Sequence, residues 1–266
     1  PGGLIGKVSK VSHFASAVEG ESGPEFAERL KTQLDAADIP VIYSKVDKIE
    51  KDGDLFRIKT ANGRYEAEGV ILATGSTPKE LPVTLPIDAK VSHFALGKEK
   101  AVRDHVVVMN GGSDGAVKEA LYLAQFAREV HIVQNQPELM CIAQFREAIE
   151  AEDNVIVHTG ATLKNVKSDG KGKITAVYLD DENNTEIFAE DGIEVFALIG
   201  QNGNGSPLSS VLPVEENGYI RQDGVGTSVK GLWTAGDVRV KAVRQVATAV
   251  SDGCLAGIEA AKVLGR

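Results

Sequence analysis

The chain has 266 residues, of which 42% are hydrophobic and 25% are charged, the composition of a globular protein long enough for two domains. A net charge of -9, with lysines and arginines scattered among carboxylates, excludes the basic surface that nucleic-acid binding needs. The sequence shows neither a membrane-spanning apolar run nor a signal peptide, and its two cysteines, Cys141 and Cys254, suggest neither a disulfide framework nor a metal cluster. We therefore expect a cytoplasmic protein without a metal site.

The first part of the chain reads as a helix followed by a small β-meander. Pro24 suits a first helical turn, and Phe26, Leu30 and Leu34 then share one face. Short strands are expected at 40–43, 46–49, 55–60 and 64–75, separated by turns such as Lys51-Asp-Gly.

The meander ends in a buried strand that breaks at a glycine. Val70-Ile-Leu-Ala is continuously apolar, as in a strand covered on both faces, and Thr74 leads to the break at Gly75.

A strand–turn–helix–strand unit follows at 104–133. Its turn, which could hold a dinucleotide, comprises Gly111, Gly112, Ser113, Asp114, Gly115 and Ala116. Such a turn at a helix N-terminus suits a pyrophosphate. However, Ser113 and Ala116 replace the second and third glycines of Gly-x-Gly-x-x-Gly, so binding of a dinucleotide and retention of the unit for packing both stay open.

The end of the second strand argues against tight NAD(P)H binding. Gln134, Asn135 and Gln136 offer no cation for a 2′-phosphate, and Glu138 comes too late to accept a ribose hydroxyl.

The remainder predicts a helix at 145–151, strands between 155 and 202, and a final strand and helix. Leu232-Trp-Thr-Ala leads to Gly236, where the lack of a Cβ would allow close backbone approach, and then to Asp237. From Val243 onward apolar residues recur at helical spacing, for example at Val246, Val250 and Ile258.

Several of these residues carry a resemblance to a known family. Ala73-Thr-Gly75, Gly236-Asp237 and Arg244-Gln-Val246 resemble the flavin-binding segments of the low-molecular-weight thioredoxin reductases. The resemblance implies an α/β, two-dinucleotide-binding-domain flavoprotein. Its FAD-binding domain would be discontinuous, at 1–88 and 205–266, with a Rossmann-like NAD(P)-binding domain inserted at 89–204.

The resemblance also implies which residues meet FAD. Asp237 would hold the ribityl chain, and the helix amides near Gln245 would face the ring carbonyl. The full set implied is Gly2, Gly3, Val46, Ala73, Thr74, Gly75, Gly236, Asp237, Arg244, Gln245 and Val246.

Three family features are missing. Phe94 and Gly97 stand where the family has its redox Cys-x-x-Cys. The cationic residues with which the family binds the 2′-phosphate of NADPH are absent at Gln134 and the two residues after it. No Gly-x-Gly-x-x-Gly unit opens the sequence. We therefore expect an FAD-dependent oxidoreductase that takes electrons from a protein donor or from weakly bound NAD(P)H, with catalytic residues unassigned.

Alternatives remain open at this point. The chain could be a non-catalytic flavin-binding or scaffold subunit, or a family enzyme without its N-terminal segment, which a separate chain could supply. The resemblance further implies a homodimer.

Overall fold

The computed structural model describes residues 2–11 and 14–265 and divides into two compact units. Unit 1 holds the residues up to 6, residues 11–77 and those from 201 onward, whereas unit 2 holds Lys7–Lys10 and Pro78–Gly200. The divisions therefore fall at 77/78 and 200/201 rather than at the expected 88/89 and 204/205. The reason is that Leu81, Val83 and Leu85 pack into a core of unit 2.

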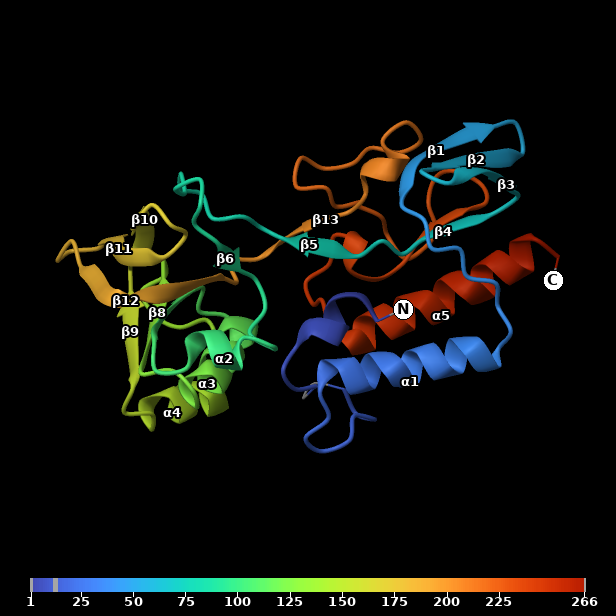
Figure 1. The fold of residues 1–266 in the computed structure, drawn as a ribbon. Helices are drawn as coiled ribbons and strands as arrows, with labels where there is room; N and C mark the ends of the chain where they lie inside the picture. Colours follow the sequence, from blue (N-terminus) through green and yellow to red (C-terminus); the bar gives the residue numbers. More distant parts are fainter. Residues whose placement is uncertain (1, 12–13, 266) are drawn as a thin grey trace. The chain divides into compact units, whose positions relative to one another are not determined.

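Unit 2 is built on a seven-stranded mixed sheet (Figure 1) with strand order β10-β11-β12-β7-β8-β9, to which β6 adds by pairing with β12. The strands are β6 (Val91–Ser92), β7 (Val106–Asn110), β8 (Glu129–Gln134), β9 (Val155–Thr159), β10 (Thr162–Ser168), β11 (Ile174–Asp180) and β12 (Glu186–Ala197). Strands β12, β7, β8 and β9 run parallel, and β10, β11 and β12 form an antiparallel part.

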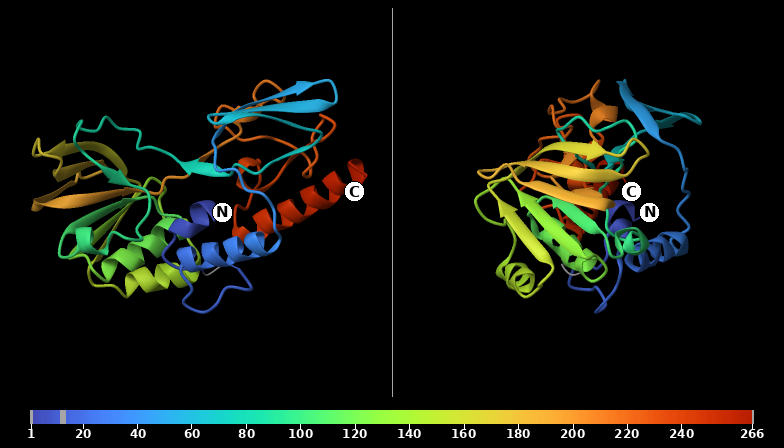
Figure 2. Two further views of the ribbon diagram at one scale, coloured as in Figure 1. Left: turned by 45° about the vertical axis from the view of Figure 1, so that its right-hand side comes forward. Right: turned by 60° about the vertical axis from the view of Figure 1, so that its left-hand side comes forward.

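Helices cover one face of this sheet. Figures 1 and 2 show α2 (Glu99–Val102), α3 (Asp114–Ala124) and α4 (Ala143–Glu150) together on one side. Val107 and Met109 of β7 point into the core beneath them, while Val106 and Val108 point into a second core with β10 and β11. This period-two alternation explains why β7 is apolar from Val106 to Met109: both of its faces are buried.

Three small sheets lie within the described part of unit 1, except that the last residue of one strand, Pro78, is assigned to unit 2. The expected meander is confirmed as β1 (Val46–Asp52), β2 (Leu55–Thr60) and β3 (Gly63–Ala67), all antiparallel. Two parallel strands, β4 (Val70–Leu72) and β14 (Leu232–Thr234), form a second sheet, and β5 (Ser76–Pro78) with β13 (Gln201–Gly203) forms a third.

The first helix begins where the sequence predicts. In α1 (Gly23–Ala36), Ser22 and Glu25 form a capping box, Pro24 lies in the first turn and Phe26 is buried. The prediction of a strand at 40–43 is wrong, because these residues form no strand and the side chains of residues 41–43 are exposed. Strand propensity alone forms no strand without a neighbour to pair with.

The last helix, α5 (Val246–Val263), is packed differently from expectation. Its buried residues are Asp252 and Ala256, whereas Val250, Leu255 and Ile258 are exposed. The helix itself was predicted correctly from the apolar spacing. However, the described residues bury only the face that carries Asp252 and Ala256 and leave the apolar residues of the other faces exposed. Unit 1 also contains the short 3-10 turns η2 (Ser206–Leu208) and η3 (Gly236–Val238), and all of η1 (Gly3–Lys7) except its last residue, which is assigned to unit 2. None of the helices in the described ranges has the length and apolarity of a bilayer-spanning segment.

Candidate functional site

Two turns meet at the carboxyl edge of the β4–β14 pair in unit 1. Because the strands are parallel, Ala73-Thr-Gly75 after β4 and Gly236-Asp237 after β14 leave the sheet at the same edge. The Ala235 N–H donates to the carbonyl of Leu72 at 2.9 Å, which holds the two turns side by side. The structure thus brings together residues that lie some way apart in the sequence.

Asn204 fixes the first of these turns. The Thr74 hydroxyl donates to the Asn204 carbonyl at 2.7 Å, and the Asn204 amide donates to the Thr74 carbonyl at 3.0 Å. The Asn204 N–H also donates to the carbonyl of Gly75 at 3.0 Å. These three bonds leave the backbone of 73–75 little freedom to move.

Gly236 is required for its backbone conformation rather than for close approach. Its φ is +75°, in the left-handed region. A Cβ at this position would lie 3.7 Å from the Cβ of Ala249, an ordinary contact, so the expected close approach is not what demands glycine.

Asp237 presents a carboxylate oxygen that lacks a hydrogen-bond partner. Its Oδ1 is buried and unbonded within the described part of the chain, and the nearest cation, Lys241 Nζ, is 3.9 Å away. Burial raises the pKa of Asp237, against the opposing positive charges of Lys241 and Arg244. A ligand that donates a hydrogen bond to this oxygen would relieve the cost of burying it.

Arg244, Gln245 and Val246 lead into α5. The Arg244 guanidinium lies 4.0 Å from the centroid of the Tyr219 ring, and its Nη2 donates to the Arg239 carbonyl at 3.4 Å. Gln245 is the N-cap residue of α5, with its N–H donating to the Thr248 hydroxyl at 3.2 Å, and Val246 is the first helical residue. The positive end of the helix macrodipole is therefore at the predicted place.

The other implied flavin contacts lie in other elements of unit 1. Gly2 is placed against α1, since a Cβ there would come 2.5 Å from that of Ala27, and Gly3 begins η1. Val46 begins β1 and packs against the core around Ile49. Within the described residues, no hydrogen bond joins these three to the turns at 73–75 and 236–237.

The two turns fit a flavin nucleotide chemically. The unpartnered Asp237 oxygen is an acceptor for a hydroxyl-rich chain. The buried hydroxyl of Thr234, the last residue of β14, also lacks a partner among the described residues. The start of α5 supplies backbone N–H groups for a carbonyl or another electron-rich group.

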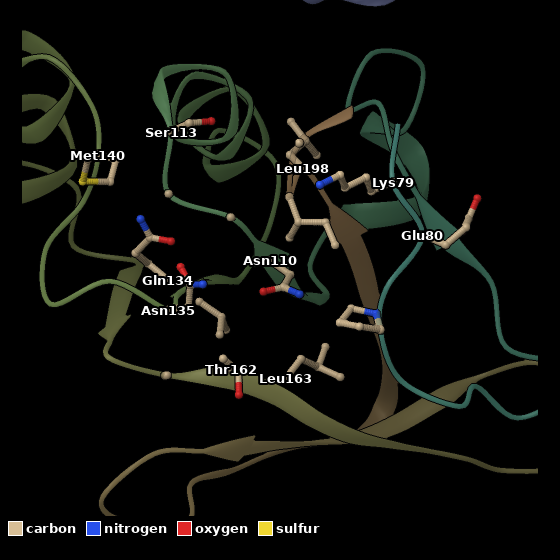
Figure 3. Close-up of a pocket in the computed structure, with 17 residues that line it drawn as sticks. Lys79, Glu80, Asn110, Ser113, Gln134, Asn135, Met140, Thr162, Leu163 and Leu198 are labelled. Atoms are coloured by element: carbon tan, nitrogen blue, oxygen red, sulfur yellow. The ribbon is translucent and has the colours of Figure 1, made fainter. Parts of the chain in front are cut away.

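Unit 2 contains a cavity of about 620 Å³ at the carboxyl ends of its parallel strands. Figure 3 shows the Gly111–Ser113 turn on one side, the end of β8 beside it and the start of β10 below. This volume is typical of small-molecule sites.

The dinucleotide turn is shaped by contacts. Gly111 has a φ of +130°, and a Cβ there would lie 2.4 Å from the Leu198 carbonyl oxygen, so this residue must be glycine. Ser113 is the N-cap of α3, and Asp114 accepts a hydrogen bond from the Ile142 N–H at 2.8 Å. Gly115 is exposed in the first turn of α3, and Ala116 is fully buried. Ser113, which replaces the second glycine of the fingerprint, lines the cavity without filling it, and the space in front of the turn remains open.

The end of β8 lies where the sequence places it. Gln134, Asn135 and Met140 line the cavity, and of the described lining residues only Lys79 and Glu80 are charged. Sequence reasoning missed Lys79, Thr162 and above all Asn110, a polar residue at the end of an otherwise apolar strand. That break in apolarity just before a glycine turn is the pattern that could have revealed it.

The positions expected for the redox dithiol and the two cysteines have the following surroundings. The Phe94 ring receives the Lys7 ammonium at 4.7 Å, and the Gly97 N–H donates to Glu99 at 2.9 Å. Burial raises the pKa of the Cys141 thiol, and Cys254 is a free, exposed residue of α5. Among the described residues no group of three His, Cys, Asp or Glu side chains is placed to hold a metal ion.

Comparisons with known proteins identify the family of the chain. The pattern of the pyridine nucleotide-disulphide oxidoreductase family matches residues 7–253. Thioredoxin reductase from Peptoclostridium acidaminophilum is 33% identical over 270 residues, which is 98% of this chain and 85% of that protein. The corresponding Escherichia coli O157:H7 enzyme is 30% identical over 277 residues, covering 99% of this chain and 85% of its own length.

Solved structures confirm the α/β fold. Lactococcus lactis thioredoxin reductase superposes with a TM-score of 0.90 at 26% identity, over 99% of this chain and 88% of that one. The T. acidophilum enzyme gives 0.87 at 27% identity, over 98% and 86%. The chain therefore belongs to the pyridine nucleotide-disulphide oxidoreductase family and is thioredoxin reductase-like.

Proposed function

We propose that the chain is an FAD-dependent oxidoreductase that passes electrons through its flavin without a redox dithiol. The observation that carries this proposal is the buried, unpartnered Asp237 oxygen at the sheet edge where Gly75 and the start of α5 also lie. NAD(P)H bound in the cavity of unit 2, or a protein, would be the electron donor.

The residues of unit 1 would hold the flavin by complementary hydrogen bonds. The Asp237 carboxylate would accept from a ribityl hydroxyl, and the backbone N–H groups near Gln245 and Val246 would face the ring carbonyl. FAD, when bound, would supply the acceptance and release of electrons. Arg244 stacks on Tyr219 and keeps a positive charge near Asp237, which favours the ionised carboxylate.

Electrons would leave the flavin without thiol exchange in this chain. Exchange needs a thiolate that attacks and a second thiol that resolves the mixed disulfide. Cys141 and Cys254 belong to different units, and burial opposes ionisation of the Cys141 thiol. We infer that the acceptor is a molecule or protein reduced directly at the flavin.

A second candidate, a non-catalytic flavin-binding or scaffold subunit, is favoured by the surface of α5. Val250, Leu255 and Ile258 are exposed on a helix of mainly small and apolar residues. Such a helix normally lies inside a protein or an interface. A further segment, a separate chain or a second copy in a homodimer would cover it, and native mass spectrometry of the purified complex distinguishes these occupants.

The visible absorption spectrum of the protein, recorded after incubation with FAD and desalting, tests the main proposal. We expect retained flavin absorbance that bleaches on anaerobic addition of NADH, NADPH or a reduced ferredoxin. Protein that stays colourless would overturn flavin binding. Yellow protein that no donor bleaches would favour the scaffold subunit.

A further inference from the structure

Two buried carboxamides in the cavity of unit 2 have no protein partner. Asn110 is 9% exposed and Gln134 is 7% exposed, and within the described residues neither side chain makes a hydrogen bond. Figure 3 shows both side chains pointing into the cavity, Asn110 from the end of β7 and Gln134 from the end of β8. The amide groups are not sealed off, since neither is among the fully buried, unbonded polar groups of the described residues. They are open to the cavity, so both can form hydrogen bonds with a ligand held there.

The Gln134 side chain is held in place by the glycine turn. A Cβ on Gly112 would lie between 2.9 and 3.0 Å from the Cβ, Cγ and Cδ of Gln134, so the stem of Gln134 packs flat on Gly112. The turn is itself tied down, because the Met140 N–H donates to the Gly112 carbonyl at 2.9 Å. The carboxamide is thus presented in a fixed position next to the N-terminus of α3.

The surroundings of Gln134 are neutral. Its neighbours in the cavity include Ser113, Asn135 and Thr162, and the charged lining residues Lys79 and Glu80 lie across the cavity from it in Figure 3. A phosphate group beside Gln134 would be buried without a cation, which is unfavourable. A hydroxyl group would satisfy the carboxamide, which both donates and accepts hydrogen bonds.

We propose that this cavity selects an adenine dinucleotide with a free ribose 2′-hydroxyl, NAD(H) rather than NADP(H), and that Gln134 makes the selection. In a strand–turn–helix–strand unit the residue that ends the second strand contacts the 2′ position of the adenosine ribose. Gln134 holds that place, so its carboxamide bonds the hydroxyl and leaves a 2′-phosphate unneutralised. The placement of a nicotinamide dinucleotide here rests on the proposed function.

Calorimetric titration with ADP-ribose and with 2′-phospho-ADP-ribose tests the inference without any flavin chemistry. We expect ADP-ribose to bind at least about tenfold more tightly, since a site built for a hydroxyl discriminates strongly against a ligand that breaks that pairing. Equal affinities, a preference for the 2′-phosphate or no binding of either compound at millimolar concentration would overturn the inference.

Variants assign the selection to Gln134. Gln134→Ala should lose about tenfold in ADP-ribose affinity, the usual cost of an unmade hydrogen bond. Gln134→Glu keeps an acceptor and should bind ADP-ribose while rejecting the 2′-phosphate further, and Gln134→Arg should reverse the preference. Gln125→Ala, on the exposed end of α3, is the matched control and should bind as the unaltered protein does. Unchanged selectivity in all three Gln134 variants, with circular dichroism showing them folded, would refute the role.

The two proposals can fail separately. If ADP-ribose binds selectively but NADH does not bleach the flavin, the inference stands and NADH is excluded as the donor. If a donor bleaches the flavin but ADP-ribose does not bind, the oxidoreductase stands and the inference falls.

Discussion

The carboxylate of Asp252, in the middle of α5, accepts a hydrogen bond from the backbone N–H of Gly236 at 2.9 Å. The same carboxylate lies 2.7 Å from Arg239 Nη1 and 3.0 Å from Lys241 Nζ, and all three charged side chains are largely buried. One residue of the helix therefore fixes the turn that carries Asp237. Burial opposes ionisation of Asp252, but the bonds from Lys241, Arg239 and Gly236 outweigh it and hold its pKa below the usual value.

Asp252→Ala should destabilise the protein by about 3–5 kcal/mol, because it leaves Arg239 buried without its carboxylate. Chemical denaturation monitored by Trp233 fluorescence reports on this region, since Trp233 lies in β14 beside the turn. Asp35→Ala is the control, because Asp35 pairs with Lys31 on the exposed side of α1, where solvent screens the pair and its loss should change stability little. Equal losses in the two variants would contradict the structural role of Asp252.

Asp237→Ala should reduce flavin retention by about tenfold or more, the effect of losing a hydrogen bond to a charged group. It should not reduce the stability of the flavin-free protein, because the buried carboxylate has no hydrogen-bond partner in the described structure and its removal relieves a burial cost. The measurements are the flavin-to-protein absorbance ratio after desalting and the unfolding midpoint without flavin.

Asp223→Ala, on an exposed loop of unit 1, is the matched control for Asp237→Ala and should retain flavin normally. Unchanged flavin content in Asp237→Ala would remove Asp237 from the site. A large drop in the stability of the flavin-free variant would instead make Asp237 a structural residue.

Gly111→Ala should destabilise unit 2 by about 2–4 kcal/mol, the range of a clash combined with an unfavourable backbone conformation. The new methyl group would meet the Leu198 carbonyl at 2.4 Å, and the φ of +130° is strained for alanine. Gly115→Ala, four residues on, places its methyl group in open space within a helix and should be neutral or stabilising by up to about 1 kcal/mol. Thermal unfolding of both variants checks this, and similar midpoints would contradict it.

The strand–turn–helix–strand unit could be predicted from the sequence because its pattern of apolar residues and glycines matches the way in which these residues pack. Strand β7 is buried on both faces and is apolar up to Asn110. Gly111 must be glycine because a Cβ at this position would clash with the Leu198 carbonyl. The resemblance implied that the turns around Thr74 and Asp237 belong to one flavin site. The structure brings the two turns together because β4 and β14 are parallel and end at one edge.

What the sequence could not predict depends on partners distant in the chain. The apolar spacing of Val250 and Ile258 defines a helix, but it does not say whether anything covers that face. Asp252 faces inward only because Arg239 and Lys241 are there to pair with it. Likewise, Asn110 can be identified as a candidate ligand-binding residue only once the fold places it with Gln134 in one cavity.

His131 and His158 form a stacked pair on neighbouring strands of unit 2, and this pair makes its stability depend on pH. The ring atoms His131 Nδ1 and His158 Nε2 are 2.9 Å apart, and His131 Nε2 is 2.5 Å from the Glu129 carboxylate. Burial first, and then the charge of His131, lower the pKa of His158, against the opposing effects of Asp181 and Glu129. The folded state therefore binds a proton at His158 more weakly than the unfolded chain, whose histidines titrate near about 6.5.

The stabilisation from neutral His158 is thus fully present above about pH 6.5 and is lost progressively as the pH falls below that value. We expect the thermal unfolding midpoint to fall between pH 7.5 and pH 5.5, and to fall less in His158→Asn, which cannot take up the proton. Differential scanning calorimetry at several pH values measures both slopes. Identical slopes would mean that His158 titrates as it does in the unfolded chain, because only a pKa difference between the two states links its protonation to stability.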